Sequence, residues 1–169
     1  MSQTAKRCAV AAVLAIAALL PQFKTLKTSE AGLQLIANAE GCLTSPYQCS
    51  ADVWTNGIGH TAGVTPQSVV SERQAAVNLV YDVMRVERAI DACMRHDMPQ
   101  PVYDAVVSWA FNVGTYAACR STLGAYINRG EWRSACLQLP RWVFVKGVFS
   151  QGLQNRRDRE LAWCLKGAA

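Results

Sequence analysis

A carboxylate, a thiol and a hydroxyl follow one another along a short stretch of the chain. Cys49 lies nine positions after Glu40, and Thr55 lies six positions after Cys49. A glycosidase needs a carboxylic acid on one side of the scissile bond, and on the other side a group that activates water or attacks the sugar. Glu40 is therefore a candidate general acid, and Cys49 and Thr55 are candidates for the opposite side.

The same residues also fit other interpretations. A single glutamate at a helix end is commonly solvated, and a cysteine of an exported protein is commonly half of a structural disulfide. A thiol amidase or peptidase could use Cys49 with His60 or His96, which would require the cysteine at a helix N-terminus. The two histidines are isolated and the sequence has no Cys-x-x-Cys, so we expect no metal site and no cofactor.

The elements that would position these groups follow from the surrounding pattern. A helix capped by Thr28 or Ser29 is predicted to run to about Asn38, because apolar residues recur there at helical spacing. Residues 41–63 carry turn signals and β-favouring residues, which predict a hairpin or a three-stranded sheet. Glu40 falls at the junction of the two elements, where a half-buried carboxylate can stay protonated and act as an acid.

The remainder of the chain predicts further helices. A capping pattern at Ser71 opens a long helix that ends near Met94, and another helix ends at Gly114. Shorter helices are predicted over residues 121–128, 131–139 and 155–165. The expected fold class is therefore α+β and mainly α, with a small β-hairpin or sheet lobe, a larger helical lobe and an apolar helix at the N-terminus.

Residues 8–20 form an uncharged, alanine-rich run directly after Lys6 and Arg7. A membrane-spanning helix needs about 20 apolar residues, whereas this run has the length of the apolar core of an export signal. Because alanine adds little transfer free energy, the run could also span weakly and leave the bilayer again. The alternatives are a signal cleaved after Ala17 and a helix buried in the folded protein. We divide the chain into an N-terminal segment, residues 1–27, and a main domain, residues 28–169.

The net charge of +5 is unevenly distributed. Residues 1–27 contain four Lys or Arg and no acid, whereas residues 120–169 contain nine Lys or Arg and three acids. The sequence has no Lys/Arg run with interleaved aromatic residues, so we expect no nucleic-acid partner. The basic C-terminal third could instead face an anionic polymer. An apolar content of 51% excludes a disordered chain.

A set of motifs in this sequence resembles the phage-type lysozymes of glycoside hydrolase family 24, the endolysins. Those proteins carry Glu, then eight residues, Asp or Cys, then five residues and Thr, and Glu40, Cys49 and Thr55 match that spacing. The resemblance depends mainly on Asn38-Ala39-Glu40-Gly41, Pro46-Tyr47 and Val53-Trp54-Thr55-Asn56-Gly57-Ile58-Gly59-His60-Thr61, and it continues in Phe111-Asn112-Val113-Gly114, Ser121-Thr122-Leu123 and the stretch from Gly152 to Glu160.

This resemblance implies a lysozyme-like fold and a muramidase that cuts peptidoglycan between N-acetylmuramic acid and N-acetylglucosamine. Glu40 would be the acid, and Thr55 would help to hold the attacking water, so that the β-1,4 bond is cut with inversion. Cys49 stands where the best-known members have Asp, and would be a partial base or a polar neighbour of the water. The candidate substrate contacts are His60, Thr61, Phe111 and Thr122. A non-catalytic wall-binding protein of the same fold is an alternative.

Seven cysteines cannot all pair within one chain, so at least one must stay free or pair elsewhere. Four of them lie in the predicted helical lobe. The preferred structural pairs there are Cys93–Cys119 and Cys136–Cys164, although sequence cannot establish pairing.

The other three cysteines, Cys8, Cys42 and Cys49, suggest a switch like that of the signal-arrest-release endolysins, which are exported tethered and inactive and are then freed. A Cys42–Cys49 bond would occupy a cleft residue while the membrane shields Cys8. After release, Cys8 could attack Cys42 and free Cys49. The alternative is a plain Cys42–Cys49 staple, with Cys8 lost in a cleaved signal.

The resemblance also implies the location and partners. The protein would be exported to the host periplasm, tethered to the inner membrane by its N-terminal segment, and then released as a soluble form. Its partners would be peptidoglycan and, through that segment, the inner membrane. We expect it to act as a monomer.

Overall fold

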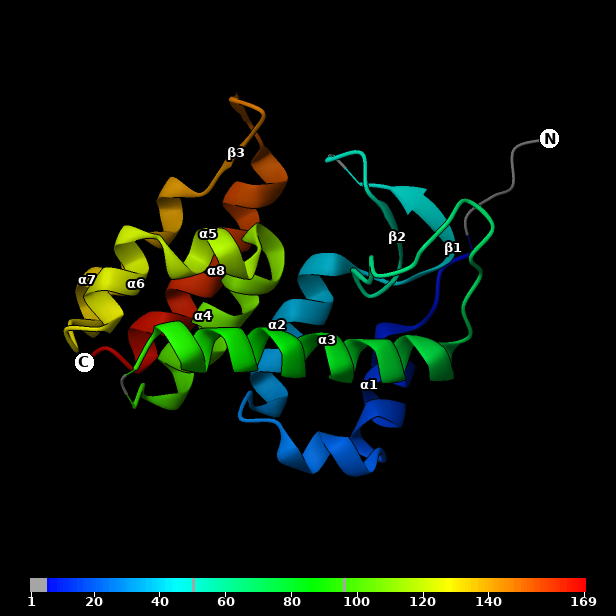
Figure 1. Cartoon of the computed structure of the whole chain (residues 1–169), viewed down its shortest axis with the longest axis horizontal. Coiled ribbons are helices and arrows are strands. Elements are labelled where there is room, and N and C mark those ends of the chain that lie inside the picture. Colours follow the sequence, from blue (N-terminus) through cyan, green and yellow to red (C-terminus); the bar gives the residue numbers. More distant parts are fainter. Residues whose placement is uncertain (1–5, 50, 96) are drawn as a thin grey trace. The chain divides into compact units, whose positions relative to one another are not determined.

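Helices dominate the structure, and the strands of the described residues form two small antiparallel sheets. The computed structural model describes residues 6–49, 51–95 and 97–169 (Figure 1). The chain divides into two units, each made of two stretches of sequence. The first unit comprises Met1–Leu26 and Ala37–Asp82, and the second comprises Lys27–Ile36 and Val83–Ala169. The predicted mainly helical α+β class is confirmed.

The apolar N-terminal run forms helix α1, Val10–Ala18, which is followed by the 3₁₀ helix η1, Pro21–Thr25. Val13 and Ala17 on α1 are fully buried. None of the helices in the described ranges is both long enough and apolar enough to cross a membrane.

Just before α1, the chain lies antiparallel to residues 42–44. The Thr44 N–H donates to the Lys6 carbonyl at 2.9 Å, and the Cys8 N–H donates to the Cys42 carbonyl at 3.2 Å. A disulfide joins Cys8 to Cys42. The N-terminal segment is therefore attached to the first unit by backbone hydrogen bonds and by a covalent bond.

The first sheet pairs β1, Leu43–Gln48, with β2, Trp54–Gly57, in antiparallel orientation. Of the two forms predicted for residues 41–63, the hairpin is the one found. Tyr47 lies opposite Thr55 in this pairing. Helix α3, Glu72–Cys93, follows in the chain, and it opens as its capping pattern predicts, with the Gln74 N–H donating to Ser71 Oγ at 3.1 Å.

Helix α2, Glu30–Glu40, begins in the second unit, where two buried carboxylates hold the residues before its first turn. Glu87 accepts from the Lys27 N–H at 2.9 Å, and from the N–H and hydroxyl of Thr28, each at 2.6 Å. Asp104 accepts from the Ser29 N–H at 2.9 Å and from its hydroxyl at 2.5 Å. We call these contacts of Lys27, Thr28 and Ser29 the α2 anchor. Breaking these hydrogen bonds would leave buried carboxylates without these donors, which costs free energy.

The second unit continues after α3 with helices and one small hairpin. In chain order these are α4 (Gln100–Val113), α5 (Thr115–Cys119), α6 (Thr122–Ile127), α7 (Trp132–Cys136), the 3₁₀ helix η2 (Leu139–Arg141), β3 (Phe144–Val145), β4 (Val148–Phe149) and α8 (Gln151–Lys166). Helix α4 packs along α8, and the fully buried Trp109 meets Trp142 edge to face at 5.2 Å. Arg156 and Arg157 pair with the buried Glu160 at 3.0 and 2.5 Å.

Several elements of the second unit differ from the sequence prediction. Helix α5 is absent from the prediction, and the helix predicted over residues 131–139 is found as α7 and then η2. Helix α8 begins at Gln151 rather than near residue 155, because Ser150 Oγ caps it by accepting from the Leu153 N–H at 3.3 Å. The hairpin β3–β4 is absent from the prediction. Lys146 and Gly147 in its turn have φ values of 49° and 78°, but a Lys-Gly pair lacks the Asn-Gly or Asp-Gly signature of such turns.

Candidate active site

Glu40 is the last residue of α2, and its side chain is half-buried. Gly41 follows with φ 69°, a left-handed conformation that turns the chain out of the helix. Strand β1 begins two residues later, at Leu43. Glu40 therefore lies at a helix–strand junction, as the sequence predicts.

Gly59 packs against the Glu40 carboxyl group. Its φ is 68°, and a Cβ atom built on it would lie 2.8 Å from Glu40 Oε2 and 2.9 Å from Glu40 Cδ. A side chain at position 59 and the observed position of the Glu40 carboxylate exclude each other. The glycine at position 59 thus leaves the space that the Glu40 carboxyl group occupies.

Replacing Gly59 with alanine is expected to lower kcat by about a hundredfold, because displacing a reacting group by about 1 Å has an effect of that size. The matched control is Gly63→Ala. Gly63 has φ 69°, but a Cβ there meets nothing within 4 Å, so the control shares the backbone strain without the contact. Measuring kcat and the free energy of unfolding of both variants tests the assignment. Equal losses of kcat would show that strain alone is responsible.

Cys49 and Thr55 donate hydrogen bonds to the same backbone carbonyl group. The Cys49 N–H and the Thr55 hydroxyl both donate to the Val53 carbonyl, each at 3.0 Å. Cys49 is a free thiol of intermediate exposure just after β1, and Thr55 is buried on β2. The hairpin thus brings together the two residues that the sequence assigns to the far side of the scissile bond.

Tyr47 is a further member of this group that the sequence analysis did not single out as a site residue. It lies directly opposite Thr55, so the two side chains share one face of the hairpin. Burial raises the pKa of the Tyr47 phenol, and the negative charges of Glu40 and of the Cys49 thiolate raise this pKa further. The phenol therefore lies in the field of both candidate groups. Period-two alternation from Cys49 back along β1 is the signal that could have identified it.

His60 is held by an acid that sequence reasoning missed. Its Nδ1 lies 2.6 Å from Asp82 Oδ2, and the two side chains are 14% and 10% exposed. His60 also exchanges backbone hydrogen bonds with Asn56. These contacts give the ring a structural partner. Thr61 follows His60 and is exposed.

The contacts of Cys49 bear on the thiol-enzyme alternative. Cys49 lies in the turn after β1 and not at a helix N-terminus, so it lacks the helix dipole that stabilises a catalytic thiolate. His96, the other proposed partner of such a thiol, lies outside the described residues.

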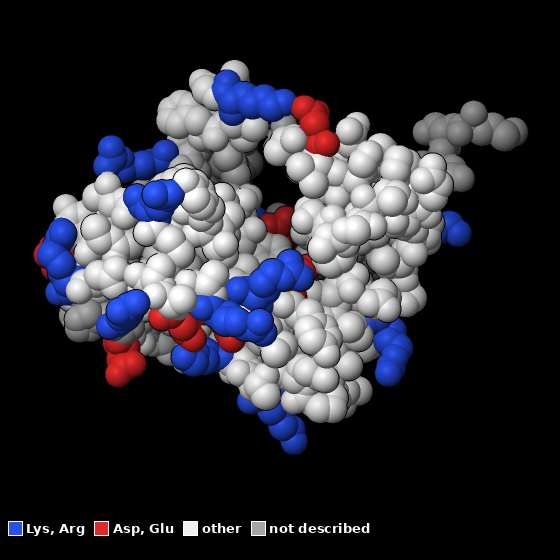
Figure 2. Space-filling model, viewed as in Figure 1, with Lys and Arg blue, Asp and Glu red and all other residues white. Residues whose placement is uncertain are grey.

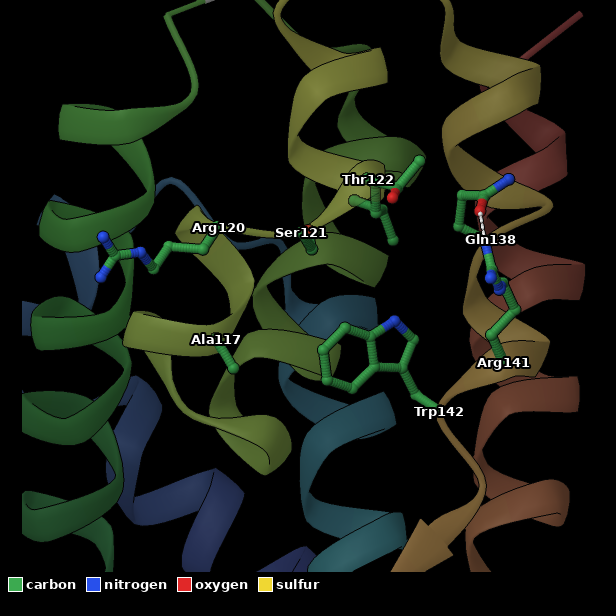
Figure 3. Close-up of a pocket in the computed structure, with 8 residues that line it drawn as sticks. Ala117, Arg120, Ser121, Thr122, Gln138, Arg141 and Trp142 are labelled. Carbon is green, nitrogen blue, oxygen red and sulfur yellow. Dashed lines mark hydrogen bonds between the residues drawn. The ribbon is translucent and has the colours of Figure 1, made fainter.

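Phe111 and Thr122, the other two candidate substrate contacts, belong to the second unit. Thr122 lines a cavity of about 430 Å³ together with Ala117, Arg120, Ser121, Leu123, Gln138, Arg141 and Trp142. Figure 3 shows Arg141 joined to Gln138 by a hydrogen bond, 3.0 Å long, while Arg120 extends away from the Trp142 ring. Phe111 is half-buried in the last turn of α4 and is not part of this lining.

The disulfides of the described residues are Cys8–Cys42, Cys93–Cys119 and Cys136–Cys164. The last two are the pairs that the sequence analysis preferred for the helical lobe. Cys8–Cys42 is the pair expected after exchange, and it leaves Cys49 free.

Known proteins match this chain along most of its length. The Phage lysozyme family model matches residues 37–160. The SAR-endolysin of Escherichia phage P1 is 37% identical over 172 residues, which cover 95% of this chain and 91% of that protein.

Two solved structures resemble the chain to different degrees. The active form of the P1 phage endolysin Lyz gives a TM-score of 0.84 at 36% identity, with 99% of this chain and 98% of that chain covered. The secreted inactive form of the same endolysin gives a TM-score of 0.60 at 38% identity, with 84% of this chain and 97% of that chain covered. The fold is therefore lysozyme-like, and the chain belongs to the phage lysozyme family as a glycoside hydrolase of the endolysin kind.

Proposed function

We propose that this endolysin hydrolyses the β-1,4 bond between N-acetylmuramic acid and N-acetylglucosamine in peptidoglycan, with Glu40 as the general acid. The observation that carries the proposal is the position of the Glu40 carboxyl group at the helix–strand junction, in the space that Gly59 leaves open. A carboxylic acid at such a position can donate its proton to the glycosidic oxygen as the bond breaks.

Thr55 and Cys49 act on the water in this proposal. The Thr55 hydroxyl donates its hydrogen to the Val53 carbonyl. The lone pairs of the hydroxyl oxygen can therefore accept a hydrogen bond from water. A water held there attacks from the face opposite the acid and inverts the anomeric centre. The Cys49 thiol lies beside that water as a polar neighbour or partial base. His60, Thr61, Phe111 and Thr122 are proposed as substrate contacts, with His60 supported by Asp82.

Product chemistry distinguishes this reaction from its alternatives. Digesting purified peptidoglycan should release new reducing ends and no new free amino groups. A thiol amidase or peptidase would release amino groups instead, and a non-catalytic wall-binding protein would sediment with the polymer and release neither. Reduction of the products with borohydride should label muramic acid, which identifies the bond that is cut.

A disulfide switch is proposed as the control of this activity. The inactive state carries Cys42–Cys49, and the active state carries Cys8–Cys42 with Cys49 as a free thiol. Two observations support this. In structure, this chain is more similar to the active form of the P1 endolysin than to its secreted inactive form, and it has Cys8 paired with Cys42 while Cys49 is free.

The length of β1 gives the switch a physical basis. All six residues of β1 lie between Cys42 and Cys49, and an extended strand rises about 3.3 Å per residue, so the two Cα atoms are roughly 20 Å apart. A disulfide needs Cα atoms about 4.4–6.8 Å apart. A Cys42–Cys49 bond therefore requires β1 to leave its extended form, which removes Tyr47 from its place opposite Thr55.

The exchange is balanced without an external oxidant. The Cys8 thiolate attacks the Cys42 sulfur, the Cys42–Cys49 bond breaks, and Cys49 leaves as a thiolate that takes up a proton. One disulfide is lost and one is formed.

Export and release complete the proposal. The relative from phage P1 carries the name SAR-endolysin. By analogy, residues 1–27 hold the protein at the inner membrane of the host with Cys8 shielded, and residues 28–169 form the catalytic domain in the periplasm. After release, α1 folds onto the first unit and the protein acts as a soluble monomer.

A further inference from the structure

The hairpin β3–β4 exposes apolar side chains at a position that the catalytic proposal does not use. Phe144 lies opposite Phe149, and their rings meet edge to face at 6.3 Å. Phe144 is 60% exposed, Phe149 51% and Val148 69%. The hairpin projects from the helices of its own unit (Figure 1).

The composition of this hairpin favours a lipid surface over a sugar as its partner. Residues 144–149 read Phe-Val-Lys-Gly-Val-Phe, so Lys146 has the only side chain that forms hydrogen bonds. Sugar sites combine an aromatic ring with several polar groups that bind hydroxyls. Exposed aromatic and aliphatic side chains without such groups are typical of segments that enter the interface of a bilayer.

The charges around the hairpin indicate which lipids it would meet. Residues 132–157 contain no Asp or Glu. Arg133 and Arg141 in this stretch are exposed, whereas Arg156 and Arg157 are buried and paired with Glu160. Figure 2 shows more Lys and Arg than acidic side chains on the visible surface. An apolar hairpin within a stretch of chain that carries exposed arginines and no acidic residue complements a bilayer that carries anionic headgroups.

We propose that the β3–β4 hairpin docks the folded enzyme onto an anionic lipid bilayer by inserting Phe144, Val148 and Phe149 into the interface. This contact is separate from the N-terminal segment, whose Val13 and Ala17 are buried in the same fold. It would keep the released enzyme at a membrane surface with its disulfide Cys8–Cys42 intact.

Vesicle flotation of the full-length, Cys8–Cys42 oxidised protein tests the proposal. Vesicles of phosphatidylcholine with one third phosphatidylglycerol should carry the wild type upward, and vesicles of phosphatidylcholine alone should carry much less. The double variant Phe144→Ser/Phe149→Ser should bind the anionic vesicles at least tenfold more weakly. Its thermal unfolding and its rate on purified peptidoglycan should stay close to those of the wild type.

The matched control is Val69→Ser/Leu137→Ser. It also removes two exposed apolar side chains, 68% and 49% exposed, and both lie outside the hairpin and outside the N-terminal segment. This control should bind vesicles like the wild type. An equal loss in control and hairpin variants, or unchanged vesicle binding of the hairpin variant, would overturn the proposal. If the hairpin variant still bound vesicles but no longer sedimented with peptidoglycan, the hairpin would be a contact for the wall polymer instead.

Discussion

The Glu40→Gln variant is expected to lose about 10²–10⁴-fold in kcat on purified peptidoglycan while folding normally. The amide has nearly the same shape as the carboxyl group, so it can occupy the same place against Gly59, but it cannot donate a proton to the leaving oxygen. General acid catalysis contributes a factor of this size. Release of reducing ends gives kcat, and chemical denaturation shows that the fold is intact.

Glu30→Gln is the matched control for this variant. Glu30 opens the helix that Glu40 closes, and its side chain is exposed. The two variants make the same chemical change at opposite ends of α2. Glu30→Gln should retain nearly all activity. If Glu40→Gln retained activity as well, the assignment of Glu40 as the acid would be wrong, and Cys49 would become the candidate nucleophile.

We expect the Cys8→Ser variant to have a lytic activity about a hundredfold or more below that of the wild type when it is isolated from an oxidising compartment. Mild reductant should restore this activity. Without Cys8, nothing in the proposed switch removes Cys49 from Cys42, so β1 cannot extend and the groups around Thr55 stay misplaced. Mass spectrometry under non-reducing conditions should find Cys42 joined to Cys49. The lytic assay then compares the sample before and after reduction.

A double variant, Cys8→Ser/Cys42→Ser, separates the switch from the stabilising effect of the Cys8–Cys42 bond. It cannot form either disulfide, so it should be active without reductant, although less stable by about 3–4 kcal/mol. If both variants were inactive and reductant rescued neither, the Cys8–Cys42 bond would be needed for the fold itself. If Cys8→Ser were fully active when oxidised, the proposed switch would be wrong.

The sequence carries a large part of the fold because the relevant signals are local. Capping residues and apolar periodicity place the start of α3 and the end of α4, and turn signals place the β1–β2 hairpin. Glu40 is found at the helix–strand junction for the same reason. The preferred pairs of the helical lobe, Cys93–Cys119 and Cys136–Cys164, are also present.

The missed features depend on contacts between residues that are distant in sequence. The packing of Gly59 on Glu40 joins the end of a helix to the turn after β2, and only the folded chain brings them together. The acid that holds His60 comes from α3, 22 residues later. The β3–β4 hairpin was missed for a different reason, since a Lys-Gly turn with two positive φ values has no strong signature.

The α2 anchor would have a mechanical consequence if the N-terminal segment changes place as proposed. A pull on the chain upstream of Lys27 reaches the hydrogen bonds to Glu87 and Asp104 before it reaches the helix. Those acceptors are buried in the second unit, and Glu40 lies at the opposite end of α2. The anchor would therefore keep the first turn of α2 in place whether the N-terminal segment is under tension or relaxed. A force on that segment would then not reach the end of α2 that carries Glu40.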